Sequence, residues 1–418
     1  MGQQNSPRSA FTLIELLIVI AVIAILSIVV VLTLNPAEML RRGRDSNRVS
    51  DLDTLTHAIS LYQEDQGTVG GQGSLGTSTI IYTSLPDSSS TCGSWNLPSP
   101  PSGYAYQCAP SSTYRSTNGS GWIPLNLSTI TTGSPLGQLP IDPTNSSSTG
   151  LYYTYVTNGS QYEVTSLFES AQYKSQYAAS PVIQNYPEVN AKGSNLTINP
   201  LWSTSGLVGY WPLDEGTGTV AVDGSGSSNN GNWSGSLING SHYTTGKVGP
   251  YAGIFDGTST YVNLQNNTNT YFQASGTYTW SVWFNINSFS PSNQTLVRKE
   301  AGSNTQGYRI SFSVTGIGIT SNATPNPTIS YNTTITSGAW YQADIIYNGT
   351  GNPNVQIYLN GVLGATGNLS SVLSDVVDQT DISDNYSPGT MNGQIDDVRI
   401  YNRALSAAEV MALYNAEK

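Results

Sequence analysis

The sequence predicts two folded parts: an α+β module, in which a long N-terminal helix packs on a small antiparallel sheet, and an all-β sandwich at the C-terminal end. Three observations support this division. An apolar run from Phe11 to Leu34 is continued by a helical stripe of apolar residues that reaches Tyr62. Short β-prone segments separated by turns fill residues 67–175. From Leu207 onward, the strands alternate apolar and polar residues.

The composition restricts the possible functions. Only 10% of the 418 residues are charged, and the formal net charge is -11. Because an acidic surface repels phosphate backbones, no nucleic-acid partner is expected. Many small polar and aromatic residues at low charge are typical of turn-rich β-structure and not of disorder. Two cysteines are too few for a disulfide scaffold and are enough for one bridge.

The N-terminus places its parts in an unusual order. In a secretory signal peptide, the small-residue cleavage site follows the apolar run, which is then discarded. Here residues 1–10 are short, polar and lightly basic, and the small residue Ala10 precedes the run. Cleavage after Ala10 would therefore remove a leader, 1–10, and leave a long helix, 11–66, on the mature protein. At ~1.5 Å per residue, its apolar part is long enough to span the hydrocarbon core of a bilayer.

Ala10 and the run Phe-Thr-Leu-Ile-Glu-Leu-Leu-Ile-Val from Phe11 to Val19 resemble the prepilin motif of type IV pilins and type II secretion pseudopilins. Gly is more usual than Ala before the cut. The resemblance implies that a prepilin peptidase cuts after Ala10 and that Phe11 is N-methylated. It also implies that the helix lies in the inner membrane before it packs with identical or related subunits into a helical filament.

Glu15 is the only charge within the apolar run. A carboxylate in an apolar helix is costly and normally has a partner. One interpretation is a tolerated charge near the membrane face. The family resemblance implies instead a pair with the new amino group of Phe11 on a neighbouring subunit, and the flanking motif favours this second interpretation.

The distribution of arginines around the apolar run favours the opposite membrane topology. Arg41, Arg42, Arg44 and Arg48 follow the apolar run, whereas only Arg8 precedes it. A positive-inside count would keep the C-terminal side in the cytoplasm. Because the remainder looks secreted and the cleavage motif must face a cytosolic-side peptidase, we expect the C-terminal side to be exported.

The helix is expected to kink at Asn35-Pro36 and to resume. Its second half carries one apolar stripe at steps of three and four, which would pack on the small domain 67–175: Val49, Leu52, Leu55, Ile59 and Tyr62. The Asn158-Gly159 pair predicts a hairpin between two strands. This arrangement resembles the C-terminal sheet of pseudopilins. Residues 176–205 are expected to form a linker.

Cys92 and Cys108 flank a Pro- and Ser-rich loop. A bridge closing it would contribute on the order of 3 kcal/mol, chiefly by restricting the unfolded chain. Two free buried thiols are the alternative, and export favours the bridge.

Residues 206–418 predict an antiparallel sandwich or jelly roll that ends in a short helix with a capping box, Ser406 and Glu409. Four sequence segments resemble the laminin-G-like, concanavalin A-type jelly roll. They lie at 209–218, 223–231, 255–258 and 395–406. The resemblance implies a ligand that is a glycan or a surface protein. It also implies a structural Ca²⁺, with Asp223, Asn229 and Asp396 as candidate ligands, because this hard cation prefers oxygen. The alternative is that these residues form Asx turns and a strand-end charge.

An enzyme is not expected. Hydrolases on this kind of sandwich place two glutamates across one strand, and no glutamates of the C-terminal domain have that spacing. The main hypothesis is therefore a pilus or pseudopilus subunit, membrane-anchored before assembly and then extracellular, which displays a lectin-like domain for adhesion. Two alternatives remain: a filament subunit with a decorative, non-binding sandwich, and a membrane-anchored surface lectin that never polymerises.

Overall fold

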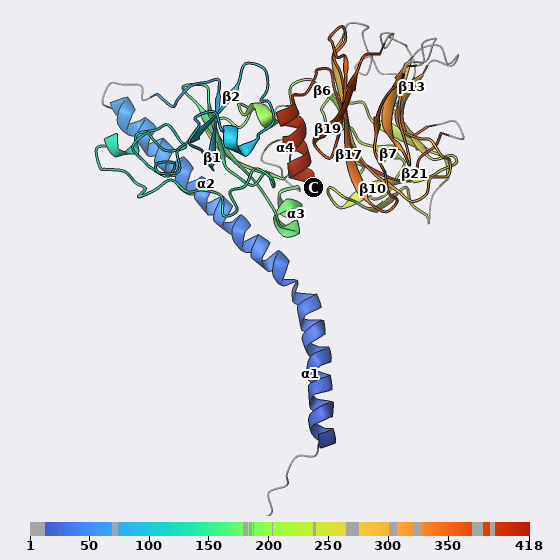
Figure 1. The fold of residues 1–418 in the computed structure, drawn as a ribbon, viewed down its shortest axis with the longest axis horizontal. Helices are drawn as coiled ribbons and strands as arrows, with labels where there is room; N and C mark the ends of the chain where they lie inside the picture. Colours follow the sequence, from blue (N-terminus) through green and yellow to red (C-terminus); the bar gives the residue numbers. More distant parts are fainter. Residues whose placement is uncertain are drawn as a thin grey trace, which may run out of the picture.

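The computed structural model describes residues 13–68, 74–178, 183, 186, 188–202, 204–236, 240–264, 276–300, 307–321, 328–369, 379–384 and 389–418. A long helical stalk leads to a small sheet, and a two-sheet sandwich lies beside that sheet (Figure 1).

Two helices form the stalk: α1 (Leu13–Leu34) and α2 (Pro36–Thr68). The expected kink at Asn35-Pro36 is confirmed, and the two helices meet at an angle there (Figure 1). Asn35 has a positive φ of 40°, and its side-chain oxygen accepts a hydrogen bond from the backbone N–H of Glu38 at 3.3 Å. Pro36 suits the first helical position because its missing N–H would have no partner there. Residues 13–24 have exposed side chains. Over the described residues, none of the helices is both long and apolar enough to qualify as a membrane-crossing segment.

The small sheet has five strands in the order β2-β1-β3-β4-β5. Their bounds are β1 (Ile80–Pro86), β2 (Ala105–Ala109), β3 (Thr154–Thr157), β4 (Tyr162–Leu167) and β5 (Val189–Gly193). Short 3-10 helices accompany them: η1 (Gly93–Trp95), η2 (Leu127–Thr129) and η3 (Pro200–Trp202). The sheet differs from the antiparallel one expected, because β1 and β2 pair in parallel. The connection from Asp87 to Tyr104 returns the chain to the end of the sheet at which β1 begins. Strand β2 therefore runs in the same direction as β1.

The apolar stripe of α2 faces this sheet. Leu52, Leu55, Ile59 and Tyr62 are buried, whereas Val49 is half-buried. The four buried residues share one core with Tyr153, Tyr155 and Val164 from the strands and with Trp122 and Leu125 from the loops. The hairpin between β3 and β4 turns at Asn158-Gly159, where Gly159 has a φ of 96°.

Residues 176–205, expected to be a linker, contribute to the small module. Helix α3 (Ala171–Ala178) begins before this stretch, and β5 pairs antiparallel with β4 from Val189 to Gly193. Val189 and Ala191 are buried in the same cluster as Leu167 and Val156. The apolar residues of β5 are few, so its alternation is too short to stand out in the sequence.

The expected antiparallel sandwich is confirmed, with two sheets consistent with a jelly roll. The first sheet has the order β19-β18-β17-β12-β21-β10-β9, with β6 paired to β21, and the second has the order β16-β15-β14-β13-β20-β11-β8-β7. The bounds are β6 (Leu207–Trp211), β7 (Val220–Ala221), β8 (Gly231–Ser234), β9 (Tyr243–Thr245), β10 (Tyr251–Asp256), β11 (Tyr261–Asn263), β12 (Tyr278–Ile286), β13 (Gln294–Glu300), β14 (Gly307–Ser313), β15 (Gly316–Ser321), β16 (Thr328–Asn332), β17 (Trp340–Tyr347), β18 (Val355–Leu359), β19 (Val362–Gly367), β20 (Thr380–Ile382) and β21 (Asn392–Tyr401). Alternate residues such as Trp280, Val282 and Phe284 of β12 fill the core between the sheets.

Helix α4 (Ala407–Glu417) joins the two folded parts (Figure 1). Its predicted capping box is present between Ser406 and Glu409. One face of α4 places Ala408, Ala412, Leu413 and Ala416 in a cluster with Leu201 and Trp202 of the small module. At its end, the Glu417 carboxylate accepts hydrogen bonds from Trp283 Nε1 (2.5 Å), Gln342 Nε2 (3.0 Å) and Arg399 Nη1 (2.5 Å) of the sandwich. The last helix of the sandwich is therefore also part of the core of the small module.

Candidate functional site: a polar groove on the sandwich

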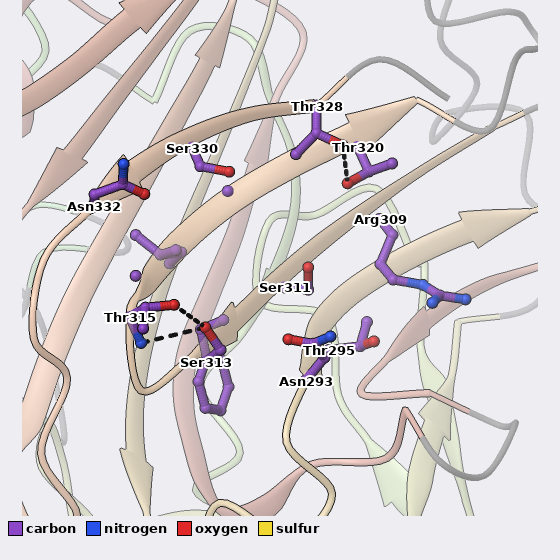
Figure 2. A pocket seen from close by; sticks show the side chains of 14 residues that line it. Asn293, Thr295, Arg309, Ser311, Ser313, Thr315, Thr320, Thr328, Ser330 and Asn332 are labelled. Atoms are coloured by element: carbon purple, nitrogen blue, oxygen red, sulfur yellow. Dashed lines mark hydrogen bonds between the residues drawn. The ribbon is translucent and has the colours of Figure 1, made fainter. Parts of the chain in front are cut away.

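A groove of about 490 Å³ lies on the outer face of the second sheet, over β14, β15 and β16 (Figure 2). The strands expose one side of their alternation. Ile310, Phe312, Ile317 and Ile319 point into the core, and their neighbours in sequence line the groove. The lining consists mainly of hydroxyl and amide side chains: Asn293, Thr295, Ser311, Ser313, Thr315, Thr320, Thr328, Ser330 and Asn332, together with Arg309.

Two glycines of the middle strand form the floor of the groove. Gly318 lies between Ser311 of β14 and Ser330 of β16, and Gly316 lies between Ser313 and Asn332. At these outward positions the middle strand has no side chain, so the polar side chains of its neighbours become walls. A Cβ on Gly318 would lie 2.6 Å from the carbonyl oxygen of Ile329. Glycine within a strand often marks a place where a ligand or another backbone approaches closely.

Arg309 is the charged residue among the described lining of the groove. Arg309 Nη2 lies 3.5 Å from Asp384 Oδ2, and Asp384 is almost fully buried. Asp384 also accepts hydrogen bonds from Arg298 Nη1 at 2.5 Å and from Thr295 Oγ1 at 3.2 Å. These contacts fix the Asp384 carboxylate beneath the groove, where it orients the Arg309 guanidinium. Hydroxyls and amides both donate and accept hydrogen bonds, so such a surface is suited to a ligand rich in hydroxyl groups.

Two of the predicted calcium ligands, Asp223 and Asn229, hydrogen-bond to each other and to nearby backbone groups. The Asp223 carboxylate accepts backbone N–H groups of Tyr210 (2.9 Å), Ser225 (2.9 Å) and Asn229 (2.8 Å). The Asn229 side chain donates to the carbonyl of Val208 at 2.6 Å. Asp223 and Asn229 therefore lie together in one turn, as the alternative interpretation describes.

Asp396 lies on β21 with a different set of partners. Its Oδ2 accepts the backbone N–H groups of Lys247 (2.8 Å) and Val248 (3.0 Å). Burial, and then the negative charge of Asp397, hold the pKa of Asp396 well above its usual range. In the described part of the chain, no three or more His, Cys, Asp or Glu side chains are grouped so that they could hold a metal ion.

Glu15, Cys92 and Cys108 do not line the groove. Ala10 and Phe11 are outside the described residues, and Glu15 lies on α1 with an exposed side chain. Cys92 and Cys108 are joined by a disulfide with a Cα–Cα distance of 5.2 Å. The sequence reasoning missed the groove itself. The sequence pattern that could have indicated it is Gly-Ile-Gly-Ile-Thr from Gly316 to Thr320, in which the glycines occupy one face of a strand.

Residues 5–31 match the prokaryotic N-terminal methylation motif. Residues 256–411 match the concanavalin A-like lectin/glucanases superfamily. Both predicted resemblances are thereby confirmed, and the chain combines a pilin-type N-terminus with a lectin-like domain. No curated protein matches this sequence.

Solved structures similar to the chain cover about half of it. Domain 4 of AbnA, an extracellular arabinanase from Geobacillus stearothermophilus, in complex with arabinotriose, is 21% identical with a TM-score of 0.40, over 50% of this chain and 98% of that one. The binding domain of Paraclostridial Mosquitocidal Protein 1 is 18% identical with a TM-score of 0.41, over 50% of this chain and 52% of that one. The binding domain of Botulinum neurotoxin DC, in complex with rat synaptotagmin II, is 18% identical with a TM-score of 0.41, over 51% and 52%.

Proposed function

We propose that the chain is a subunit of a type IV pilus or pseudopilus that displays its sandwich for adhesion to glycans or surface proteins. The observation that carries this proposal is the combination of a methylation motif at residues 5–31 with a lectin-like domain at residues 256–411. The motif indicates a secreted, surface-exposed pilin-type protein, and the two parts together favour a structural or binding role over an enzymatic one.

In this proposal, the leader 1–10 is removed after Ala10, and the helix holds the subunit in the membrane before assembly. Glu15 then pairs with the amino group of Phe11 on a neighbouring subunit. The packing of α2 on the five-stranded sheet supports a pilin-like module. The described ion pairs also account for two of the arginines that opposed this topology. Arg44 and Arg48 contact Glu169, Asp45 and Asp142 within the folded module. Arg48 is buried and Arg44 is half-buried, so the charges of both are engaged by carboxylates of the module.

The groove over β15 is the proposed adhesive surface. Its floor of glycine and its walls of hydroxyl and amide groups offer many neutral hydrogen bonds, which suits a saccharide. Figure 2 shows these side chains along the neighbouring strands.

A filled groove tests this assignment. The full chain, kept in a non-ionic detergent, is applied to a glycan array as wild type, as Ser330→Tyr and as Thr366→Tyr. Ser330 is exposed on the groove wall, whereas Thr366 is exposed on β19 of the opposite sheet. We expect Ser330→Tyr to weaken glycan binding about tenfold or more, because the larger side chain fills part of the groove. The hydrogen bonds that the ligand loses there are worth about 1.4 kcal/mol or more. Thr366→Tyr should bind as wild type. Equal loss in both variants would remove the groove from the proposal, and no binding by wild type would favour the decorative sandwich.

Assembly is tested separately at Glu15. Glu15→Ala should abolish filaments if the subunit polymerises through its helix, whereas Glu64→Ala, an exposed position of α2, should leave them intact. Filaments formed by Glu15→Ala would contradict the role of Glu15 in assembly, and an absence of filaments in wild type would favour the surface lectin that never polymerises. Electron microscopy of sheared surface material gives the readout.

A further inference from the structure

A second cavity, of about 590 Å³, lies between the small module and the sandwich. Figure 1 shows α3 and the C-terminal end of α4 meeting near β10 at this place. Its walls come from both parts of the chain: Arg41, Glu169, Lys174 and Glu188 from the small module, and Asp214, Lys247, Glu417 and Lys418 from the sandwich. Junctions between domains are common places for small-molecule sites.

Three lysines from three elements line this cleft, and the described contacts of their amines are with neutral groups. Lys174 Nζ, on α3, donates to the carbonyl of Ala416 at 3.0 Å. Lys247 Nζ, from the turn between β9 and β10, lies 5.1 Å from the centre of the Trp283 ring. Lys418 Nζ donates to Asn415 Oδ1 at 2.6 Å and to the carbonyl of Ser148 at 3.4 Å.

The amines also lie near enough to repel one another. Burial lowers the pKa of Lys247 and of Lys418, and the positive charge of Lys174 lowers both further, although the charges of Glu417 and Asp396 oppose the shift of Lys247. The pKa of Lys174 is itself lowered, first by burial, although the charges of Glu188, Asp45 and Glu417 oppose this. A negative group placed between the amines would relieve this repulsion.

The carboxylates of the cleft are largely engaged or neutral. Glu169 is held by Arg44 and Arg48, with contacts of 2.7 Å to each. Glu417 is held by Arg399, Trp283 and Gln342. Burial raises the pKa of Glu188 to about 7, which favours the uncharged form of this carboxyl.

We propose that this interdomain cleft binds a small molecule through an oxyanion group, a carboxylate, sulfate or phosphate, held by Lys174 and Lys247 and completed by Lys418. The cleft volume falls within the range typical of small-molecule sites. Lysine amines bind such groups through charge-assisted hydrogen bonds, which are about twice as strong as neutral ones. Because the amines come from both folded parts, the bound anion clamps the sandwich to the small module. This site is independent of the adhesive groove.

Isothermal titration of the full chain in non-ionic detergent tests the proposal with three probes: sodium glucuronate, sodium sulfate and inorganic phosphate. Sodium chloride holds the ionic strength constant, so that screening does not change during the titration. Wild type should bind at least one probe, and the ranking of the three identifies the preferred oxyanion. The double variant Lys174→Gln/Lys247→Gln should bind that probe about a hundredfold more weakly, at about tenfold for each lost charge-assisted bond.

Lys192→Gln is the matched control, because Lys192 pairs with Asp53 of α2 at 2.9 Å and does not line the cleft. It should bind as wild type. Near-UV circular dichroism without anion establishes that each variant is folded, and Lys247→Gln alone replaces the double variant if that one is not. Undetectable binding of all three probes by wild type, or equal affinity in the cleft variants and in Lys192→Gln, would overturn the proposal.

Discussion

Arg48 and Asp142 form a two-point ion pair that is fully excluded from solvent. Arg48 Nε lies 2.6 Å from Asp142 Oδ2, and Nη2 donates to Oδ1 at 2.9 Å. The same guanidinium contacts Asp45 at 2.8 Å and Glu169 at 2.7 Å. One cation on α2 thus holds two loops of the small module, and its own helix, in a fixed arrangement.

Removing this cation should be costly. Arg48→Met would leave the Asp45 and Asp142 carboxylates buried without their cation, so we expect a loss of about 3–5 kcal/mol in the free energy of unfolding. Arg44→Met is the comparison, since Arg44 is partly exposed and pairs with Glu169 at the surface. Its loss should be about 1 kcal/mol or less. Urea denaturation followed by circular dichroism measures both. Equal losses would contradict a central role for Arg48.

The disulfide should stabilise the small module. Replacing Cys92 and Cys108 by Ser opens a loop with a sequence separation of 16, and the loop-entropy estimate gives a loss of about 3 kcal/mol. The single variant Cys108→Ser serves as a control and should lose a similar amount, because either change removes the bond. Alkylation of the native exported protein without reductant provides the direct check, and modification of both thiols would contradict the pairing.

Glu163 should make the stability depend on pH. Burial raises the pKa of Glu163 to about 7, although backbone N–H groups of Asn199 and Ile198 hydrogen-bond to its Oε2 at 2.9 and 3.1 Å and oppose the shift. A pKa raised in the folded state stabilises the protein at low pH. That contribution falls as the pH rises from the unfolded value of 4.5 to about 7. The loss amounts to about 3 kcal/mol at ~1.4 kcal/mol per pKa unit.

Glu163→Gln should remove this part of the pH dependence, because the amide keeps an acceptor for the two backbone N–H groups and does not ionise. Urea denaturation at mildly acid and mildly alkaline pH measures the change. Asp53→Asn is a control, since Asp53 is exposed. If wild type and Glu163→Gln show the same slope with pH, the Glu163 prediction is wrong.

Processing should leave Phe11 as the first residue of the exported chain. The cut removes Arg8, the only charged residue of the leader, so the formal net charge falls from -11 to -12. Mass spectrometry should find an N-methylated Phe11. An intact Met1, or a cut beyond Leu34, would contradict the assignment of the N-terminal segment.

Calcium binding by the sandwich stays a prediction. A ligand that binds only the folded state adds about 2.7 kcal/mol at a hundredfold excess over Kd, and Asp396→Asn should reduce that gain. Melting of the full chain in excess calcium and in chelator gives the comparison. Identical curves would leave Asp223 and Asn229 as residues of a turn, which is how their hydrogen bonds place them.

The features that the sequence predicted well depend on short stretches of chain. The methylation motif, the strand alternation of β12 and the capping box of α4 each depend on residues that are close together in the sequence. The features it missed depend on distant segments. Arg48 meets Asp142 and Glu169 at separations of 94 and 121 residues, so the sequence showed it only as one of four arginines that follow the apolar run.

The direction of β2 and the shapes of the groove and the cleft could not be predicted from the sequence either. The parallel pairing of β1 with β2 depends on the path of the loop between them, which composition does not determine. The groove depends on which face of β15 its glycines occupy, and this requires the register of Gly318 with Ser311 and Ser330. The interdomain cleft needs the docking of α4, which no local pattern specifies.

The two-sided packing of α4 also has a mechanical consequence. A load applied to the sandwich reaches the stalk by two parallel routes, the covalent connection after η3 and the apolar face of α4. Ala408 and Ala412 must slide or separate from Trp202 before the connection bears the whole force. Because α4 is also anchored in the sandwich by Glu417, we expect a pull along the stalk to load this buried surface as well as the covalent connection, and to bend the subunit less easily than a covalent connection alone would allow.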